Sequence, residues 1–67
     1  MSIVFCLNIV MDNQAFQDEN AGEELARILK QLANNLRSRP EGVEVILPIG
    51  LFDYNGNMVG FAEMFRW

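Results

Sequence analysis

The segment Asp53-Tyr54-Asn55-Gly56-Asn57 lies between two apolar runs and constrains the fold more than any other part of this chain. Asn-Gly between two strand-like runs is a strong local signal for a β-hairpin. Two turns are compatible with it. One is a two-residue turn at Asn55-Gly56, and the other is a three-residue loop in which Asp53 opens a type I turn and Gly56 forms a G1 bulge. The turn sets the register, and therefore which side chains share a face.

The three-residue loop produces the better cross-strand pairs, and we expect it to form. It places Glu44 opposite Arg66, an opposite-charge pair, whereas the two-residue turn places Glu44 opposite Trp67. The further pairs in this register are Gly50–Gly60, Ile46–Met64, Phe52–Met58, Val43–Trp67, Val45–Phe65, Ile49–Phe61 and Leu51–Val59. This register therefore predicts that Phe61, Phe65 and Trp67 lie on the core face of the sheet.

Three segments have the composition and alternation of β-strands, at residues 3–11, 43–52 and 57–67. Pro48 lies within the second segment and cannot donate a hydrogen bond to a neighbouring strand, so that strand is expected at an edge. An antiparallel sheet with the order 1-3-2 satisfies this condition. The sequence thus predicts one α+β domain over residues 1–67 with βαββ order, in which one helix packs on one face of a three-stranded sheet.

The helix is predicted over residues 20–38. Asn20 and Glu23 have the spacing of a capping box, and Pro40 ends the helix because the residue before proline avoids helical geometry. Glu23 precedes Arg27 by four residues, which favours an ion pair. The apolar stripe expected to face the sheet consists of Ala21, Leu25, Ile28, Leu29, Leu32 and Leu36. Residues 12–19 are interpreted as a loop with Phe16 folded back as a plug, or alternatively as a first helical turn.

Acidic residues gather around the start of this helix: Asp18, Glu19, Glu23 and Glu24. Negative charge at a helix N-terminus complements the helix dipole, and this is the interpretation we favour. The alternative is an acidic patch that mimics a polyanion.

The composition argues against several classes of function. The chain has no His and a single Cys, so the most common general acid–base group is absent and a zinc site or an internal disulfide is not expected. We therefore expect no enzyme, no catalytic residue, no metal and no cofactor. The net charge of −4 argues against direct nucleic-acid binding. The chain has no apolar run of membrane-spanning length and no basic segment before its first apolar run, so a cytoplasmic location is expected.

The second face of the predicted sheet is also apolar, although a one-sided antiparallel sheet normally has polar residues there. The residues predicted on it are Val4, Cys6, Val10, Ile46, Pro48, Phe52, Met58 and Met64. An exposed patch of this kind usually marks an interface, and a chain of 67 residues is only marginally able to stabilise itself with one core. We expect a homodimer that stacks two such sheets. A host protein or a small ligand held at sheet or subunit junctions are the alternative occupants.

Three segments of the chain form recognisable motifs: Asn-x-Ala-Phe at residues 13–16, Glu-Leu-Ala-Arg-Ile-Leu at 24–29, and Asp-x-Asn-Gly-Asn-x-Val-Gly at 53–60. In these motifs the chain resembles a group of small proteins encoded by tailed phages and prophages. The group has no assigned activity, so the resemblance transfers no functional residues. It implies a phage accessory protein in the cytosol of a bacterial host, where such proteins bind and block host machinery, including defence systems, as anti-CRISPR proteins do.

Overall fold

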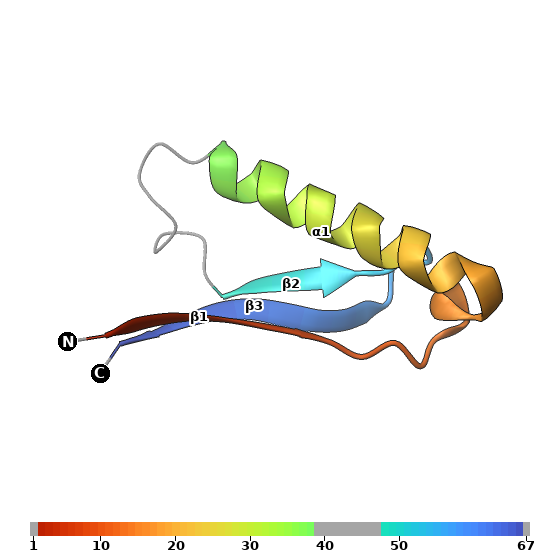
Figure 1. Ribbon diagram of the computed structural model, residues 1–67, viewed down its shortest axis with the longest axis horizontal. Helices are drawn as coiled ribbons and strands as arrows, with labels where there is room; N and C mark the ends of the chain where they lie inside the picture. The colour runs from red at the N-terminus through yellow and green to blue at the C-terminus, as the bar shows by residue number, and fades with distance from the viewer. Residues whose placement is uncertain (1, 39–47, 67) are drawn as a thin grey trace.

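The computed structural model describes residues 2–38 and 48–66, and it confirms the predicted α+β fold (Figure 1). Strand β1 (Ile3–Ile9) leads through two short 3₁₀ turns, η1 (Gln14–Phe16) and η2 (Asp18–Asn20), into helix α1 (Ala21–Arg37). Strands β2 (Ile49–Phe52) and β3 (Met58–Arg66) then form a hairpin. None of the described helices is long and apolar enough to cross a membrane.

The sheet is antiparallel with the predicted order β1-β3-β2. Strand β1 pairs with β3 along its whole length, from Ile3 opposite Arg66 to Ile9 opposite Gly60. Strand β2 is a short edge strand that begins directly after Pro48, as expected from the missing donor of proline. The helix lies over one face of the sheet, and its C-terminal end rises away from the strands (Figure 1).

The hairpin turn is the predicted three-residue loop. The amide of Gly56 donates to the carbonyl of Asp53 at 3.0 Å, and the amide of Asp53 donates to the carbonyl of Asn57 at 2.9 Å. Gly56 has a φ of 85°, in the left-handed region that glycine adopts without strain. The pair Phe52–Met58 next to the loop is also as predicted.

A β-bulge beyond the first pair changes the rest of the predicted register. Phe52 lies opposite Met58 but Leu51 lies opposite Gly60, so Val59 is an extra residue on β3. The predicted pairs of Ile49, Gly50 and Leu51 are therefore wrong by one residue. Their observed partners are Ala62, Phe61 and Gly60.

This shift of one residue exchanges the faces of β3. Ala62 and Met64 share the helix side with Leu7 and Phe5, their partners on β1. The opposite side, which we call the far face, receives Phe61 and Phe65, with Asn8 and Val4 as their β1 partners. The predictions that Phe61 and Phe65 lie in the core, and that Met64 lies on the second face, are therefore wrong. Val43, Glu44, Val45, Ile46 and Trp67 lie outside the described residues.

The core lies between α1, η1 and the sheet. Its buried apolar residues are Ala15, Phe16, Ile28, Leu32, Leu51, Val59 and Ala62. Phe16 is 5% exposed and confirms the predicted plug. Leu29 of the predicted stripe is 38% exposed, because the helix turns that position away from the sheet.

The ends of the helix agree with the prediction to within one residue, but the predicted capping box is absent. Asn20 has helical dihedral angles and its side chain makes no capping hydrogen bond. The reason is that η2 runs directly into α1, so the chain is already coiled before the predicted cap. At the other end, the amide of Ser38 donates to the carbonyl of Asn34 and ends the helix.

Candidate functional site

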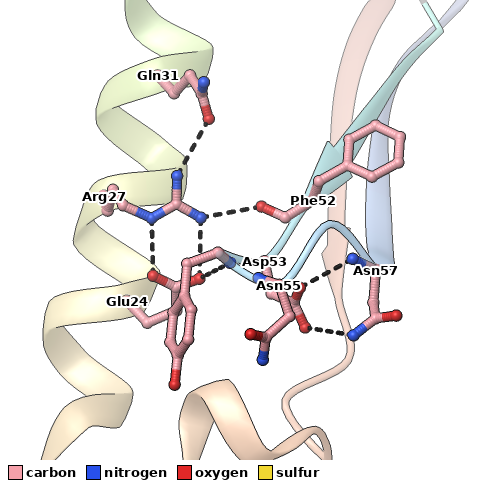
Figure 2. A network of polar contacts seen from close by, with 8 residues as sticks. Glu24, Arg27, Gln31, Phe52, Asp53, Asn55 and Asn57 are labelled. Atoms are coloured by element: carbon pink, nitrogen blue, oxygen red, sulfur yellow. Dashed lines mark hydrogen bonds and ion pairs between the residues drawn. The ribbon is translucent and has the colours of Figure 1, made fainter.

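A network of polar contacts, which we call the polar clasp, joins the helix to the hairpin turn (Figure 2). Its centre is Glu24, which is 5% exposed and accepts two hydrogen bonds from Arg27, at 2.7 Å from Nε and 2.9 Å from Nη2. The amide of Tyr54 donates to the same carboxylate at 2.7 Å. Arg27 Nη2 also donates to the carbonyl of Phe52 at 3.1 Å, so both ends of the ion pair hold the hairpin.

Asp53 is the second buried carboxylate of the clasp. Its Oδ1 accepts from the amides of Asn55 and Asn57, each at 2.9 Å, which holds the turn in shape. Its Oδ2 accepts from Asn13 Nδ2 at 2.9 Å and from Asn57 Nδ2 at 3.3 Å. Because Asn13 belongs to the segment that leads into η1, this contact joins a third part of the chain to the same place.

Both carboxyl groups are stabilised in their charged form. The hydrogen bond from Arg27, partly offset by burial, lowers the pKa of Glu24 below its usual range. The hydrogen bond from Asn13, again partly offset by burial, lowers the pKa of Asp53. The side-chain hydrogen bond to Glu24 raises the pKa of Arg27. The charged carboxylates accept the hydrogen bonds that join the helix, the hairpin turn and the segment before η1.

The clasp corrects two predictions about the acidic residues. Arg27 pairs with Glu24, three residues before it, and the predicted pairing with Glu23 is wrong. Glu24 is buried and therefore does not belong to an exposed acidic patch, whereas Glu19 and Glu23 are exposed. The side chain of Asp18 lies outside what the structure describes.

A hollow of about 350 Å³ lies beside the clasp, lined by Asn20, Glu23, Glu24, Arg27 and Tyr54. Two of its charged groups, Glu24 and Arg27, are already bonded to each other. In the part of the chain that the structure describes, no three His, Cys, Asp or Glu side chains come together as metal ligands.

The far face of the sheet is the more distinctive surface. The pairings place Val4, Cys6 and Asn8 of β1 on it, beside Phe65, Glu63 and Phe61 of β3. Phe52 and Met58 extend it over Gly50, because a Cβ atom on Gly50 would lie 3.2 Å from Met58 Cε and 3.3 Å from Phe52 Cε1. Figure 2 shows the Phe52 ring directed away from α1 while its carbonyl faces Arg27.

The large side chains of the far face are open to solvent. Phe52 is 49% exposed, Met58 60%, Phe61 37% and Phe65 42%. Aromatic residues and methionine are the types enriched at protein–protein interfaces. Glu63 is the charged residue among the described side chains on this face, and it makes no hydrogen bond or ion pair with another described residue.

The structure places four of the predicted interface residues on the far face: Val4, Cys6, Phe52 and Met58. Val10 follows the end of β1 and is 59% exposed. Sequence reasoning missed Phe61 and Phe65, which replace Met64 on this surface. The available signal was Gly60, since a glycine within a strand often accompanies a bulge.

The segments at residues 13–16, 24–29 and 53–60 meet at the clasp. Asn13 comes from the first segment, Glu24 and Arg27 from the second, and Asp53 and Asn57 from the third. The polar residues of these segments therefore take part in holding the fold together. Comparisons of the chain with models of protein families, with curated proteins and with solved structures find no significant match.

Proposed function

We propose that this protein is a non-catalytic binding module whose far face docks against another protein. The observation that carries the proposal is the concentration of exposed Phe52, Met58, Phe61 and Phe65 on one side of a small sheet. Apolar side chains gathered on one exposed surface usually mark an interaction site. The polar clasp supports this role because it fixes the hairpin that presents Phe52 and Met58.

Glu63 supports a foreign partner over a second copy stacked on the same face. Glu63 lies between Phe61 and Phe65 along β3 and opposite Cys6 on β1. Stacking two far faces would remove two carboxylates from water on a surface where the described residues supply no counter-ion, which is strongly unfavourable. A partner with an apolar surface and one Lys or Arg would satisfy both the rings and the carboxylate. We therefore propose a protein of this chemistry as the occupant.

The resemblance to phage and prophage proteins supports a narrower proposal, in which the partner belongs to the bacterial host. A small binding module of this kind would act on such a target by occupying its surface. A component of a host defence system, as for an anti-CRISPR protein, is one target of this kind. The proposal also fits the exposed acidic residues Glu19 and Glu23, which would favour a partner with a basic rim.

The test is recovery of the protein and its partner from bacterial cells, with native mass spectrometry of the complex. We expect the wild-type chain to retain a host protein and Phe61→Asp to lose it, because a carboxylate would then replace a central ring. Leu29→Asp is the matched control, since Leu29 is 38% exposed against 37% for Phe61 but lies on α1. Circular dichroism confirms that both variants are folded.

Glu63→Lys adds a test of the proposed charge pairing. It should weaken the complex, and exchange of the opposing basic residue on the partner for Glu should restore it. Equal binding by wild-type and Phe61→Asp protein would overturn the proposal. So would a complex that only Leu29→Asp disrupts, because the binding surface would then be the helix.

A further inference from the structure

The outer edge of β1 is open in the part of the chain that the structure describes. Strand β1 is at one end of the order β1-β3-β2 and spans seven residues, Ile3–Ile9. Its partner on the inner side is β3. An open edge presents a row of backbone donors and acceptors to any strand of suitable sequence.

The two edges of this sheet differ in how they are protected. Natural sheets protect their edges with charged side chains, proline, bulges or very short strands. The β2 edge has three of these features, because it spans four residues, follows Pro48 and faces a bulge. The β1 edge, Ile-Val-Phe-Cys-Leu-Asn-Ile, contains neither a charged residue nor a proline, and its pairing with β3 has no irregularity.

The direction of the backbone groups follows from one hydrogen bond. The amide of Val10, directly after β1, donates to the carbonyl of Val59 on β3 at 2.7 Å. Because these groups alternate along a strand, the even-numbered residues of β1 direct their amides and carbonyls to β3. The odd-numbered residues Ile3, Phe5, Leu7 and Ile9 therefore direct theirs outward.

The same residues also have unusually exposed side chains. Ile3 is 58% exposed, Phe5 45% and Leu7 40%, although all three lie on the helix side of the sheet. Among the described residues the helix makes its main contacts with η1, η2 and β2, so it leaves this part of the sheet largely uncovered. These large apolar side chains lie on the helix side, next to the open backbone edge, and remain exposed. Further apolar side chains beyond the edge would be needed to bury them.

We infer that β1 pairs with β1 of a second copy, antiparallel about a two-fold axis at Cys6, to form a continuous six-stranded sheet. In this register all seven residues are paired: Ile3 with Ile9, Val4 with Asn8, Phe5 with Leu7, and Cys6 with itself. The outward-directed odd residues form the hydrogen-bonded pairs. The paired side chains on the helix side are all apolar. The exposed Ile3, Phe5 and Leu7 of the two copies then lie side by side and form one continuous apolar surface.

Charge favours a second copy as the occupant of this edge. The chain has a net charge of −4, so two copies repel each other wherever their acidic surfaces meet. None of its nine acidic residues lies in β1. The edge is therefore a surface on which self-pairing brings no like charges opposite each other. It also leaves the far face open in both copies, so this inference does not depend on the proposed function.

Cys6 provides a direct test because it is the single cysteine of the chain. In the inferred register it occupies a non-hydrogen-bonded pair, where Cα atoms lie about 4.5 Å apart, within the range that a disulfide spans. Mild oxidation of the full chain should produce a covalent dimer. Its rate should not depend on protein concentration, because the thiols are already adjacent.

Two single-cysteine variants test the register. Val4→Cys and Asn8→Cys, each combined with Cys6→Ser, should form a disulfide only slowly alone, because each residue lies opposite the other and not opposite itself. Mixing the two variants should form the disulfide about tenfold faster than either alone, as expected for thiols held in place. A mixture no faster than the separate variants would overturn the inferred pairing.

Native mass spectrometry separates this inference from the proposed function. We expect a dimer for the wild-type chain and for Phe61→Asp, and a monomer for Leu7→Lys, whose charge would lie at the shared edge. Folding of Leu7→Lys is checked by circular dichroism. A monomeric wild-type chain, or a dimer that Phe61→Asp separates and Leu7→Lys does not, would overturn the edge pairing. Loss of host-protein binding in Phe61→Asp would still support the far face.

Discussion

The amide of Tyr54 donates a hydrogen bond of 2.7 Å to the carboxylate of Glu24, which lies thirty residues earlier in the chain. This contact connects the first turn and a half of α1 to the tip of the hairpin. The same carboxylate binds Arg27, so the hairpin is attached to an ion pair that the helix itself forms. One buried charge therefore helps to fix the position of the hairpin relative to the helix, together with the apolar core.

Glu24→Gln should lower the free energy of unfolding by about 2 kcal/mol, because Arg27 and the Tyr54 amide lose a charged acceptor. Glu23→Gln is the matched control, since Glu23 is the adjacent residue and is exposed. A change within about 0.5 kcal/mol is expected for it. Urea unfolding followed by circular dichroism measures both. Equal effects of the two substitutions would show that Glu24 does not stabilise the hairpin.

Acid should destabilise this protein through Glu24 and Asp53. Their pKa values in the folded chain are below those of free carboxyl groups, so the unfolded chain binds protons first as the pH falls. Their contribution is complete above the ordinary carboxyl pKa of about 4 and is lost as the pH falls toward the folded values. The free energy of unfolding, measured at a series of pH values, should therefore decrease below about pH 5.

The double variant Glu24→Gln, Asp53→Asn is the control for this pH dependence. It should be less stable at neutral pH but should lose less of its remaining stability on acidification, since the two shifted groups are absent. An acid profile parallel to that of the wild-type chain would assign the pH dependence to other groups.

Gly60→Ala should be strongly destabilising. A Cβ atom at this position would overlap the carbonyl oxygen of Asn8 and lie 2.8 Å from its carbonyl carbon, and the backbone of β1 cannot move without breaking its pairing with β3. A loss of about 3 kcal/mol is expected for such overpacking.

Gly22→Ala is the matched control for the glycine substitution. A Cβ atom on Gly22 would meet no neighbouring side chain or strand within 4 Å, and alanine favours a helix over glycine by about 0.5–1 kcal/mol. Thermal unfolding should therefore show a higher midpoint for Gly22→Ala and a much lower one for Gly60→Ala. Similar midpoints for the two variants would contradict the close approach of β1 to the bulge.

The fold and the hairpin loop could be predicted because local features encode them. The alternation in residues 3–9, the spacing of Ile28 and Leu32, and the Asp53 to Asn57 loop each act over a few neighbouring residues. The position of Pro48 then indicated which strand lies at an edge. Part of the far face was also predictable, because Val4 and Cys6 alternate with residues of the helix side.

Contacts between distant segments decided the rest. The bulge at Val59 depends on Val10 and Leu51, which hold β3 from both sides, and it moved Phe61 and Phe65 out of the predicted core. The burial of Glu24 depends on the Tyr54 amide thirty residues away, and helix periodicity alone could not distinguish it from the exposed Glu23. The sequence by itself determined the elements and their order, because these follow from short-range preferences. The tertiary structure alone decided the faces and the buried ion pair, because both require partners that the chain brings together only on folding.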